Sequence, residues 1–511
     1  MFTAQNIKWY AVLLFVFGLS VAARLPTLTR PISRHYEGNN GLILVTLNAW
    51  AQRGISTYNY CPVSTFSNIG DSHLHSIDTH RRLTNGRDAY YLSIGPLWYY
   101  MPYIFNNAFN NANSNQNLRI FNLLLAFISL LFVFRVSQIF FIDNQNTNTA
   151  AFITTIIYLF LPQTLWYQGN VYVHEGAVLP FLYAAFYFFI SIQQNNTVIY
   201  RHWIAYAASI ACATAIDWVG CVAALCMGCA ALYRSRVTVF AAYRNPKKWY
   251  FTLFAISGGI AVAAVAAIAV LYSTAIDYAT FKTYALFRMH DRNSFAKDGL
   301  MQVFLLRQLA FNYALAYAFP LFITTSIFGL LQYKKQDLRL TPEQKNGIFL
   351  LSSVVLVHHF IMLGHAAAHD YATLKFALPL SLTAGFLVDK LLIWHKKIGI
   401  VTVFLFITTS LFQYYIINPA GCCDTNGIKY DVFEQAGKAI AANTMPDEVL
   451  FINCQNLARP DVEYYACRNQ TLIFTKQKAV EYMQTHPARK ACFISAQGHT
   501  ITAFDHFISN K

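Results

Sequence analysis

The sequence predicts a mainly α-helical polytopic membrane protein that ends in a small α/β domain. Hydrophobic residues make up 56% of the 511-residue chain, and charged residues only 12%. Apolar runs of about 17–25 residues recur along the chain, the length of a helix that crosses a bilayer. Because lipid offers backbone groups no hydrogen-bond partner, these runs are expected to be helices. After residue 417 the hydropathy falls and short strand-like segments follow.

We expect about eleven membrane-spanning helices. The first, 8–24, also has the length of a signal peptide. No clear small-residue cleavage site follows it, so we interpret it as a retained anchor. The expected spans are 8–24, 118–141, 149–167, 178–193, 202–218, 219–233, 249–272, 311–332, 346–364, 372–391 and 398–416.

Basic residues in short loops orient these spans. If the N-terminus lies in the cytoplasm, the inside loops are 233–249, 332–345 and 389–397, all short and basic. We therefore predict a multi-pass membrane protein with a cytoplasmic N-terminus and an extracytoplasmic C-terminal domain, which in a bacterial cell would lie in the plasma or inner membrane. Many of the charges behind the formal net charge of +15 lie in such loops, so no nucleic-acid partner is predicted. The outer loops are then 25–117, 167–180, 273–310 and 364–371.

The long first outer loop contains two apolar elements. GLILVTLNAWAQRG (41–54) has helical periodicity and is half apolar, which predicts a helix in the membrane interface. AYYLSIGPLWYYMPYIF (89–105) is rich in Tyr and has two prolines. It predicts a second interfacial or re-entrant element, because aromatic rings favour the membrane boundary.

The segment after residue 417 has the pattern of a small α/β domain. We expect helices at 431–443 and 476–486 and strands at 448–453, 471–476 and 490–495. The chain then divides into a transmembrane domain, 1–416, and an extracytoplasmic domain, 417–511. Six cysteines are expected on the oxidising outer side, and some of them are expected to form disulfides in the tail domain, with a pairing that the sequence leaves open. They are Cys61, Cys422, Cys423, Cys454, Cys467 and Cys492.

Glu37 is a lone carboxylate in RHYEGNNG (34–41), a few residues after the first span. One interpretation is a solvated interfacial acid paired with Arg34. We favour a functional carboxylate, because the Asn and Gly residues that follow allow close backbone approach. A partly desolvated carboxylate at a lipid–water boundary makes a good general base. Tyr36 and Asn39 are expected to bind substrate beside it.

His174 and Glu175 lie in the outer turn between the third and fourth spans. An exposed loop acid is the alternative interpretation. The predicted topology puts Glu175 on the same membrane face as Glu37. Two carboxylates that converge there could hold a divalent metal ion (Mg, Mn or Zn) or orient an acceptor. Asp217, at the outer end of the fifth span, is expected to line the same cavity or to cap a helix turn.

Two further motifs lie on the outer side. The 89–105 element contains Tyr90, Pro96 and Tyr99, and Arg119 follows at the start of the second span. HDYATLKFALP (369–379) leads into the tenth span and contains His369, Tyr371 and Lys375.

Together these motifs resemble the polytopic glycosyltransferases of the GT-C fold, which include protein O-mannosyltransferases and lipid A aminoarabinose transferases. That group has an acid opening a long first outer loop, a Pro-Leu-aromatic-aromatic element, an Arg before the second span and a second acid between the third and fourth spans. A His/Arg-x-Tyr…Pro motif follows near a late span. The matching features here are Glu37, GPLWYY (95–100), Arg119, Glu175 and HDY…LP, over the chain to about residue 390.

The resemblance implies transfer of a sugar from a polyprenyl-phosphate donor, bound with membrane lipid, to a hydroxyl acceptor on the outer face. The acceptor could be a lipid, a glycan or a protein. Glu37 would be the base, Glu175 a second acid, and 1–416 the catalytic domain. The family often has Asp-Glu where this chain has Tyr36-Glu37, so the base role rests on Glu37 alone.

A second departure concerns the donor phosphate. Ser93-Ile94-Gly95 replaces a Lys that often contacts this phosphate in the family, so other cations must bind it. For Arg288, His290 and Arg292, contact with lipid headgroups is an equal alternative. The candidates are Arg34, Arg81, Arg82, Arg288, His290 and Arg292.

Three other functions compete with this prediction. A polymerase or ligase that moves whole lipid-linked glycans differs only in donor size, which the sequence does not reveal. A transporter would place charges within spans and show repeat symmetry between its halves. We find neither pattern in the sequence. A membrane anchor for the tail would need neither eleven spans nor the ordered acids.

Overall fold

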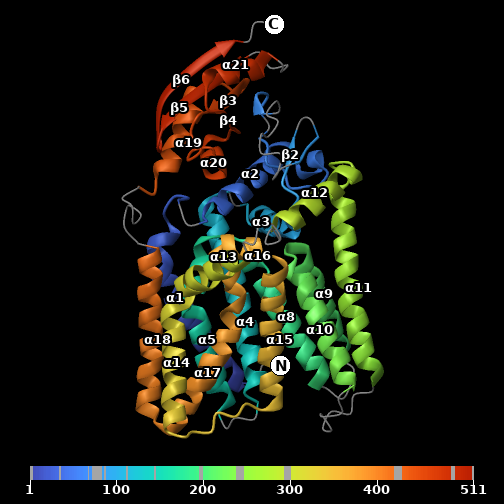
Figure 1. Cartoon of the computed structure of the whole chain (residues 1–511), viewed down its shortest axis with the longest axis vertical. Helices are drawn as coiled ribbons and strands as arrows, with labels where there is room; N and C mark the ends of the chain where they lie inside the picture. Colours follow the sequence, from blue (N-terminus) through green and yellow to red (C-terminus); the bar gives the residue numbers. More distant parts are fainter. Residues whose placement is uncertain are drawn as a thin grey trace. The chain divides into compact units, whose positions relative to one another are not determined.

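The structure is a computed structural model of the whole chain (Figure 1). Contacts between Cα atoms divide it into two compact units. Unit 1 comprises Met1–Leu25, Asn122–Ala266 and Met289–Ile417, and unit 2 comprises Pro26–Phe121, Ala267–Arg288 and Asn418–Lys511. The residues that the structure describes are 4–33, 36–66, 68–71, 83–85, 88–110, 113–142, 146–194, 199–236, 247–292, 301–418, 429–484 and 490–508.

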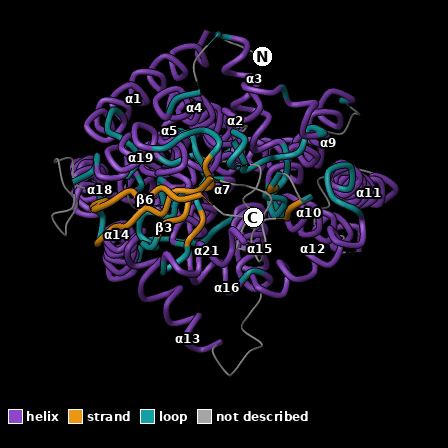
Figure 2. The backbone as a smooth tube through the Cα atoms, turned by 90° about the horizontal axis from the view of Figure 1, so that it is seen from above, coloured by secondary structure: helices purple, strands orange, loops and turns teal. Residues whose placement is uncertain are grey.

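Unit 1 is built of helices, which Figure 2 shows from one end. Four helices begin in one unit and end in the other: α1 (Ala4–Leu28), α4 (Asn115–Phe140), α11 (Lys247–Tyr272) and α12 (Tyr278–Arg292). The remaining helical elements of unit 1 are α5 (Thr147–Phe160), α6 (Pro162–Leu165), η3 (Trp166–Asn170), α7 (His174–Ala177), α8 (Leu179–Gln194), α9 (Tyr200–Ile216), α10 (Val219–Arg236), α13 (Met301–Leu306), η5 (Arg307–Tyr313), α14 (Ala314–Tyr333), α15 (Pro342–Ile361), α16 (Leu363–Ala368), η6 (Asp370–Phe376), α17 (Ala377–Trp394) and α18 (Lys396–Ile417).

The apolar helices mark an integral membrane protein. Among the described residues, seven helices are long and apolar enough to cross a membrane, and one bent pair would make an eighth. Each expected span coincides with helical structure, so the mainly helical membrane fold is confirmed. The count of eleven is not confirmed, because α9, α10 and α15 do not belong to this group.

The span expected at 149–167 is broken. The helical segment Pro162–Asn170 is bent by 64° from α5. Leu161 between them has φ −56° and ψ 137°. This extended conformation follows from the ring of Pro162, which crowds the α conformation of the preceding residue. The break leads the chain into the segment that carries the candidate site.

Unit 2 contains a four-stranded sheet with the strand order β4-β3-β5-β6. β3 pairs in parallel with β4 and β5, whereas β5 pairs antiparallel with β6. Figure 2 shows the strands in orange. The predicted small α/β region is confirmed. Its elements are α19 (Val432–Asn443), β3 (Glu448–Ile452), α20 (Pro460–Ala466), β4 (Thr471–Leu472), α21 (Lys476–Gln484), β5 (Lys490–Gln497) and β6 (Thr500–Ile508).

The first outer loop supplies further elements of unit 2, and part of this loop packs on the tail. A Cβ on Gly41 would lie only 2.7 Å from the backbone N of Asp461, so α2 and α20 touch backbone to backbone. The Asn469 side chain accepts from the N–H of Phe66 (2.6 Å) and donates to the C=O of Ser64 (2.8 Å). The division at residue 416 stays a prediction. The loop elements are α2 (Gly38–Arg53), η1 (Ile55–Tyr58), β1 (Leu83–Thr84), β2 (Ala89–Tyr90) and α3 (Leu97–Ala108).

The expected disulfides are not found among the described residues. Cys61, Cys454, Cys467 and Cys492 are free thiols, so the expectation is wrong for pairs among these four. The first three direct their sulfur toward backbone carbonyls instead, and Cys492 is buried in the core of the sheet. The other two cysteines expected on the outer side, at positions 422 and 423, lie outside the described residues.

Candidate functional site

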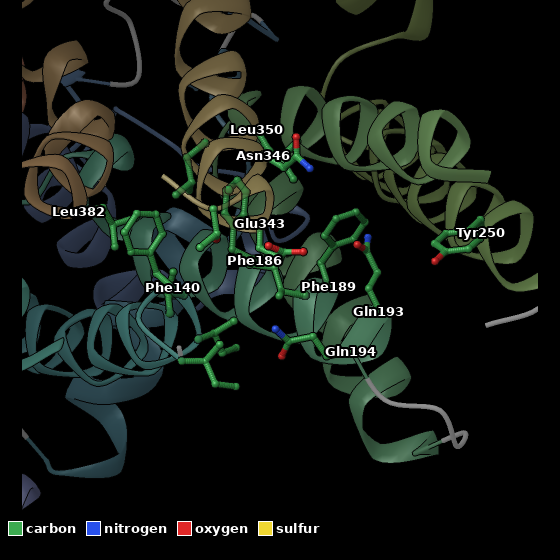
Figure 3. Close-up of a pocket in the computed structure, with 17 residues that line it drawn as sticks. Phe140, Phe186, Phe189, Gln193, Gln194, Tyr250, Glu343, Asn346, Leu350 and Leu382 are labelled. Atoms are coloured by element: carbon green, nitrogen blue, oxygen red, sulfur yellow. The ribbon is translucent and has the colours of Figure 1, made fainter. Parts of the chain in front are cut away.

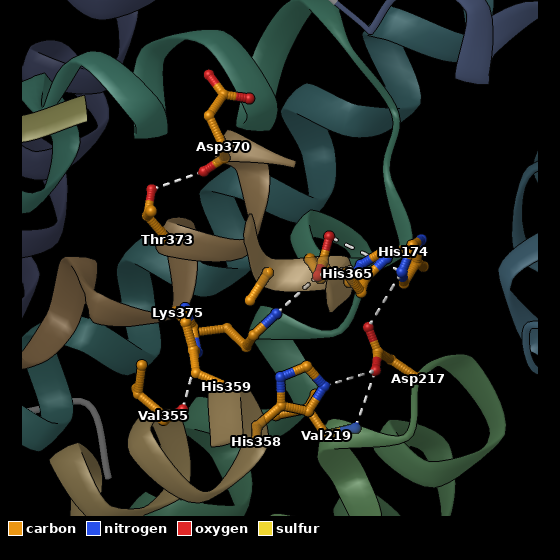
Figure 4. Close-up of polar contacts among 12 residues, drawn as sticks. His174, Asp217, Val219, Val355, His358, His359, His365, Asp370, Thr373 and Lys375 are labelled. Atoms are coloured by element: carbon orange, nitrogen blue, oxygen red, sulfur yellow. Dashed lines mark hydrogen bonds and ion pairs between the residues drawn. The ribbon is translucent and has the colours of Figure 1, made fainter. Parts of the chain in front are cut away.

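A cluster of buried charged side chains lies within unit 1 (Figure 4). Its centre is Glu175, which has no exposed surface. Glu175 Oε1 accepts from Lys375 Nζ at 2.9 Å and lies 3.2 Å from His365 Nε2. The Lys375 side chain is also fully buried. One oxygen therefore meets two cation-forming groups away from water, where charge interactions are strongest.

His174 links Glu175 to a second carboxylate. Its Nε2 atom lies 3.8 Å from Glu175 Oε2 and 3.6 Å from Asp217 Oδ2. On the other side of Asp217, His358 Nε2 is 3.8 Å from Oδ1. Asp217 Oδ1 also accepts from the N–H of Val219 at 2.9 Å, so this carboxylate caps the start of α10. Figure 4 shows this chain of contacts from His174 to His358.

The backbone that carries His174 and Glu175 is irregular between η3 and α7, and four C=O groups of residues 167–171 accept hydrogen bonds from buried side chains. The Asn122 amide donates to the C=O groups of Tyr167, Gly169 and Val171 at 3.1–3.2 Å. Arg24 Nη1 donates to the C=O of Gln168 at 3.0 Å. Irregular backbone at membrane depth needs such partners, because lipid supplies none. These contacts fix the turn that presents Glu175.

An aromatic and imidazole wall borders the cluster. The rings of His369 and Tyr371 are stacked with centroids 4.8 Å apart, and the His365 ring is 4.7 Å from His369. Burial lowers the pKa of His369 to about 3, and the nearby His365 acts in the same direction. Neighbouring Asp370 accepts from the Tyr167 hydroxyl at 2.5 Å. The His369 imidazole is therefore neutral at ordinary pH, and its stacking on Tyr371 fixes its orientation.

Three of these residues could hold a metal ion. The ligand atoms of His174, Glu175 and His365 all lie within 4.8 Å of one another. Two imidazoles and a carboxylate are a donor set that suits zinc. The Lys375 ammonium shares Glu175 Oε1 with this set and would compete with the ion for that oxygen.

A second buried acid lies in unit 2. Glu37 has no exposed surface, and its Oε1 atom accepts from Arg119 Nη2 at 2.6 Å. Its Oε2 atom accepts from the N–H of Ser33 at 2.9 Å and from the Ser33 hydroxyl, while Arg30 Nη2 lies 3.7 Å away. Arg119 Nη1 also donates to the C=O groups of Leu28 and Arg30. Glu37 is thus paired with Arg119 rather than solvated.

Solved structures of two membrane transferases are similar to the chain over almost its whole length. ArnT from Cupriavidus metallidurans bound to undecaprenyl phosphate aligns over 97% of this chain and 94% of its own, with 12% identity and a TM-score of 0.58. The oligosaccharyltransferase AglB from Archaeoglobus fulgidus, solved with an inhibitory peptide and a dolichol-phosphate, aligns over 96% and 70%, with 12% identity and a TM-score of 0.59. The chain has the GT-C fold.

A further structure of the Archaeoglobus fulgidus enzyme, in complex with zinc and sulfate, aligns over 94% of this chain and 68% of its own. Its identity is 13% and its TM-score 0.54. No protein-family model and no curated protein sequence matches the chain. The predicted resemblance to GT-C enzymes is therefore confirmed at the level of the fold.

The site residues that were predicted in the first outer loop belong to turns, strands and helices of unit 2. Tyr36 has a left-handed backbone (φ 65°), and its C=O accepts from both the backbone and the side-chain N–H of Asn39. Tyr90 is buried in β2, and burial raises its pKa. Pro96 precedes the first turn of α3, which buries Tyr99. Whether any of them contacts substrate stays a prediction.

The predicted phosphate-binding cations are divided between the units. Arg288 belongs to unit 2, whereas His290 and Arg292 belong to unit 1. His290 is exposed, and Arg292 is buried and acts electrostatically on His369. Arg34, Arg81 and Arg82 lie outside the described residues.

Sequence reasoning missed two histidines of the unit 1 cluster. His358 is one of an adjacent pair in the apolar run VLVHHF (355–360), and paired histidines in such a run were an available signal. His365 lies in GHAAAHDY (364–371), where only His369 and Tyr371 were predicted as site residues. The convergence of Glu37 and Glu175 at one site stays a prediction, since the two acids belong to different units.

Proposed function

We propose that the chain is a membrane glycosyltransferase that moves a sugar from a polyprenyl-phosphate donor to a hydroxyl acceptor on the outer membrane face. The observation that carries this proposal is the GT-C fold, which extends over 94% of an enzyme solved with undecaprenyl phosphate. Such a transfer needs buried acids and cations, and each unit by itself contains a buried acid paired with a cation.

Glu37 is the proposed general base. The Ser33 hydroxyl already donates to Glu37 Oε2, so this oxygen accepts a hydrogen bond from an alcohol. An acceptor hydroxyl would take the place of Ser33 and give its proton to the carboxylate as it attacks the sugar. Arg119 holds the other oxygen and fixes the direction of Oε2. Attack opposite the departing phosphate would invert the anomeric centre.

Lys375, His365 and His174 are proposed to stabilise the departing lipid phosphate. A fixed cation in a buried site lowers the energy of charge that develops in the transition state. Glu175 is the second acid, and it neutralises Lys375 until the donor arrives. A metal ion, if bound, would be held by His174, Glu175 and His365 and would supply Lewis-acid stabilisation. The topology proposed with this function has a cytoplasmic N-terminus and an extracytoplasmic tail.

A second candidate function is the transfer of a whole lipid-linked glycan. The similarity to AglB, an oligosaccharyltransferase, supports this alternative. It uses the same groups and differs in the size of the donor. The mass of a bound donor distinguishes the two.

The test is to identify lipids that co-purify with wild type and Glu37→Gln in mild detergent by mass spectrometry. We expect polyprenyl phosphate in the wild type and enrichment of its glycosylated form in the variant, which binds donor but cannot complete transfer. Glu434→Gln, a charge removal on α19 of the same unit, is the control and should match the wild type. If neither protein carries polyprenyl lipid and added donor does not bind, the proposal is wrong.

A further inference from the structure

A pocket of about 250 Å³ lies in unit 1 among helices α4, α8, α11, α15 and α17 (Figure 3). Its apolar wall includes Phe186, Leu351 and Leu382. Its polar lining includes Gln194, Glu343 and Asn346. A small cavity with an apolar wall and a few polar groups is the usual form of a ligand site. None of its residues belongs to the charged cluster around Glu175.

The pocket and the charged cluster lie at opposite ends of the same helices. Glu175 and Gln194 are the second and last residues of the 21-residue span His174–Gln194. At a rise of about 1.5 Å per residue they are roughly 28 Å apart along the helix axis. On α15, Glu343 precedes His358 by roughly 22 Å by the same rise. These lengths approach the thickness of about 30 Å of the hydrocarbon core, so the pocket opens near the membrane boundary opposite the cluster.

The polar and apolar groups of the pocket are ordered with depth. Gln194 and Glu343 stand at helix ends, whereas Phe186 and Leu351 lie two turns further into the bundle, about 12 Å by helical rise. A ligand that satisfies both ends has a polar head at the boundary and an apolar chain that points toward the bilayer centre. Membrane lipids have this form.

The charge of the pocket determines which type of lipid headgroup it favours. Glu343 is the one charged residue that lines it, and Glu343 forms no ion pair with any residue in the described part of the chain. A carboxylate favours an ammonium group and repels a headgroup with net negative charge. The amides of Gln194 and Asn346 can donate hydrogen bonds to a phosphate. This combination complements a zwitterionic headgroup.

We propose that this pocket binds a phospholipid with a primary ammonium headgroup, with one acyl chain between α4, α8, α15 and α17. The ammonium group pairs with Glu343, and the phosphate accepts from the amides. The lipid comes from the membrane leaflet opposite the charged cluster. It stabilises the helices that carry the cluster, at the ends that lie far from the cluster. The proposal does not depend on glycosyl transfer.

The test compares lipid retention in nanodiscs of equal phosphatidylethanolamine and phosphatidylglycerol, released and analysed by native mass spectrometry. We expect the wild type to retain one phosphatidylethanolamine with a preference of about fivefold, the scale of one partly exposed ion pair. Glu343→Gln should lose the preference, and Glu343→Asp should keep it. Equal retention of the two lipids by the wild type, or a preference for phosphatidylglycerol, would overturn the proposal.

A second pair of variants tests the cavity itself. A Cβ on Gly347 would meet only Phe140 Cδ2, at 3.9 Å, so a side chain fits there and extends into the pocket. Gly347→Leu should abolish the lipid adduct, whereas Gly347→Ala should retain it and shows that the position tolerates a side chain. Retention of the adduct by a monodisperse Gly347→Leu protein would contradict the proposed place of the acyl chain.

Discussion

Glu37 and Glu175 are both completely buried carboxylates, yet their surroundings differ. Glu37 is paired with a guanidinium on one oxygen and a serine on the other. Glu175 directs one oxygen to an ammonium and an imidazole, and its Oε2 atom makes no hydrogen bond within the described residues. The comparison teaches that one buried acid already accepts a hydrogen bond from a hydroxyl, whereas the other meets an ammonium and an imidazole. The sequence alone does not reveal this difference between the two acids.

The largest expected effect is on the rate of sugar transfer, and it distinguishes Glu37 from Glu175. Glu37→Gln should lower the transfer rate by roughly 10²–10⁴-fold, because a general base contributes about that much. Donor binding should persist, since the cations of unit 1 are untouched. The measurement is transfer of radiolabelled sugar from purified donor, with binding followed separately. A rate within about threefold of wild type would remove Glu37 from the base role.

Lys375→Met should cost roughly 3–5 kcal/mol of unfolding free energy, because it leaves Glu175 buried without its cation. Unfolding in a denaturing detergent measures the loss. Lys438→Met is the matched control: its pair with Glu434 is largely exposed, and we expect a loss of about 0.5 kcal/mol or less. Adding Glu175→Gln to Lys375→Met should recover part of the loss. If Lys375→Met and Lys438→Met lose an equally small free energy of unfolding, the unit 1 cluster is not a buried ionic centre.

Ser33→Ala sharpens the comparison from the side of Glu37. The change removes one hydrogen bond to a charged group, which stabilises by roughly 1.5–3 kcal/mol. It also leaves Glu37 Oε2 open to an alcohol, so transfer should be maintained or increased while stability falls. Parallel unfolding and transfer assays separate the two effects. A loss of transfer with unchanged stability would mean that the serine hydroxyl itself takes part in the reaction.

His369→Phe is expected to change the pH dependence of stability. The folded state binds this proton only near pH 3, whereas an unfolded histidine binds it near pH 6.5. Between these values the unfolded chain holds more protons, so stability falls as the pH is lowered, by at most about 1.4 kcal/mol per pH unit. Phe keeps a ring against Tyr371 and should remove the contribution of His369 to this slope. Unfolding at pH 7 and pH 5 measures it, and equal slopes in both proteins would contradict the burial of a neutral imidazole.

The sequence by itself determined the class of fold and the types of groups at the sites. Apolar runs must be helices in lipid, so the helices of the membrane region follow from composition. The break at Leu161 follows from Pro162, although it was expected to lie within a straight span. The strand β6 was missed because its sequence, TITAFDHFI, alternates polar and apolar residues only over its first four positions.

Only the tertiary structure decided which side chains meet. Glu175 and its partners His365 and Lys375 are separated by 190 and 200 residues, and Glu37 and Arg119 by 82. Helical periodicity reports which residues share a face of one helix, but it carries no information about which helices become neighbours. That choice depends on close packing, as where Gly385 of α17 meets Thr154 of α5 with no room for a Cβ. The acids were therefore predictable from the sequence, and their partners required the fold.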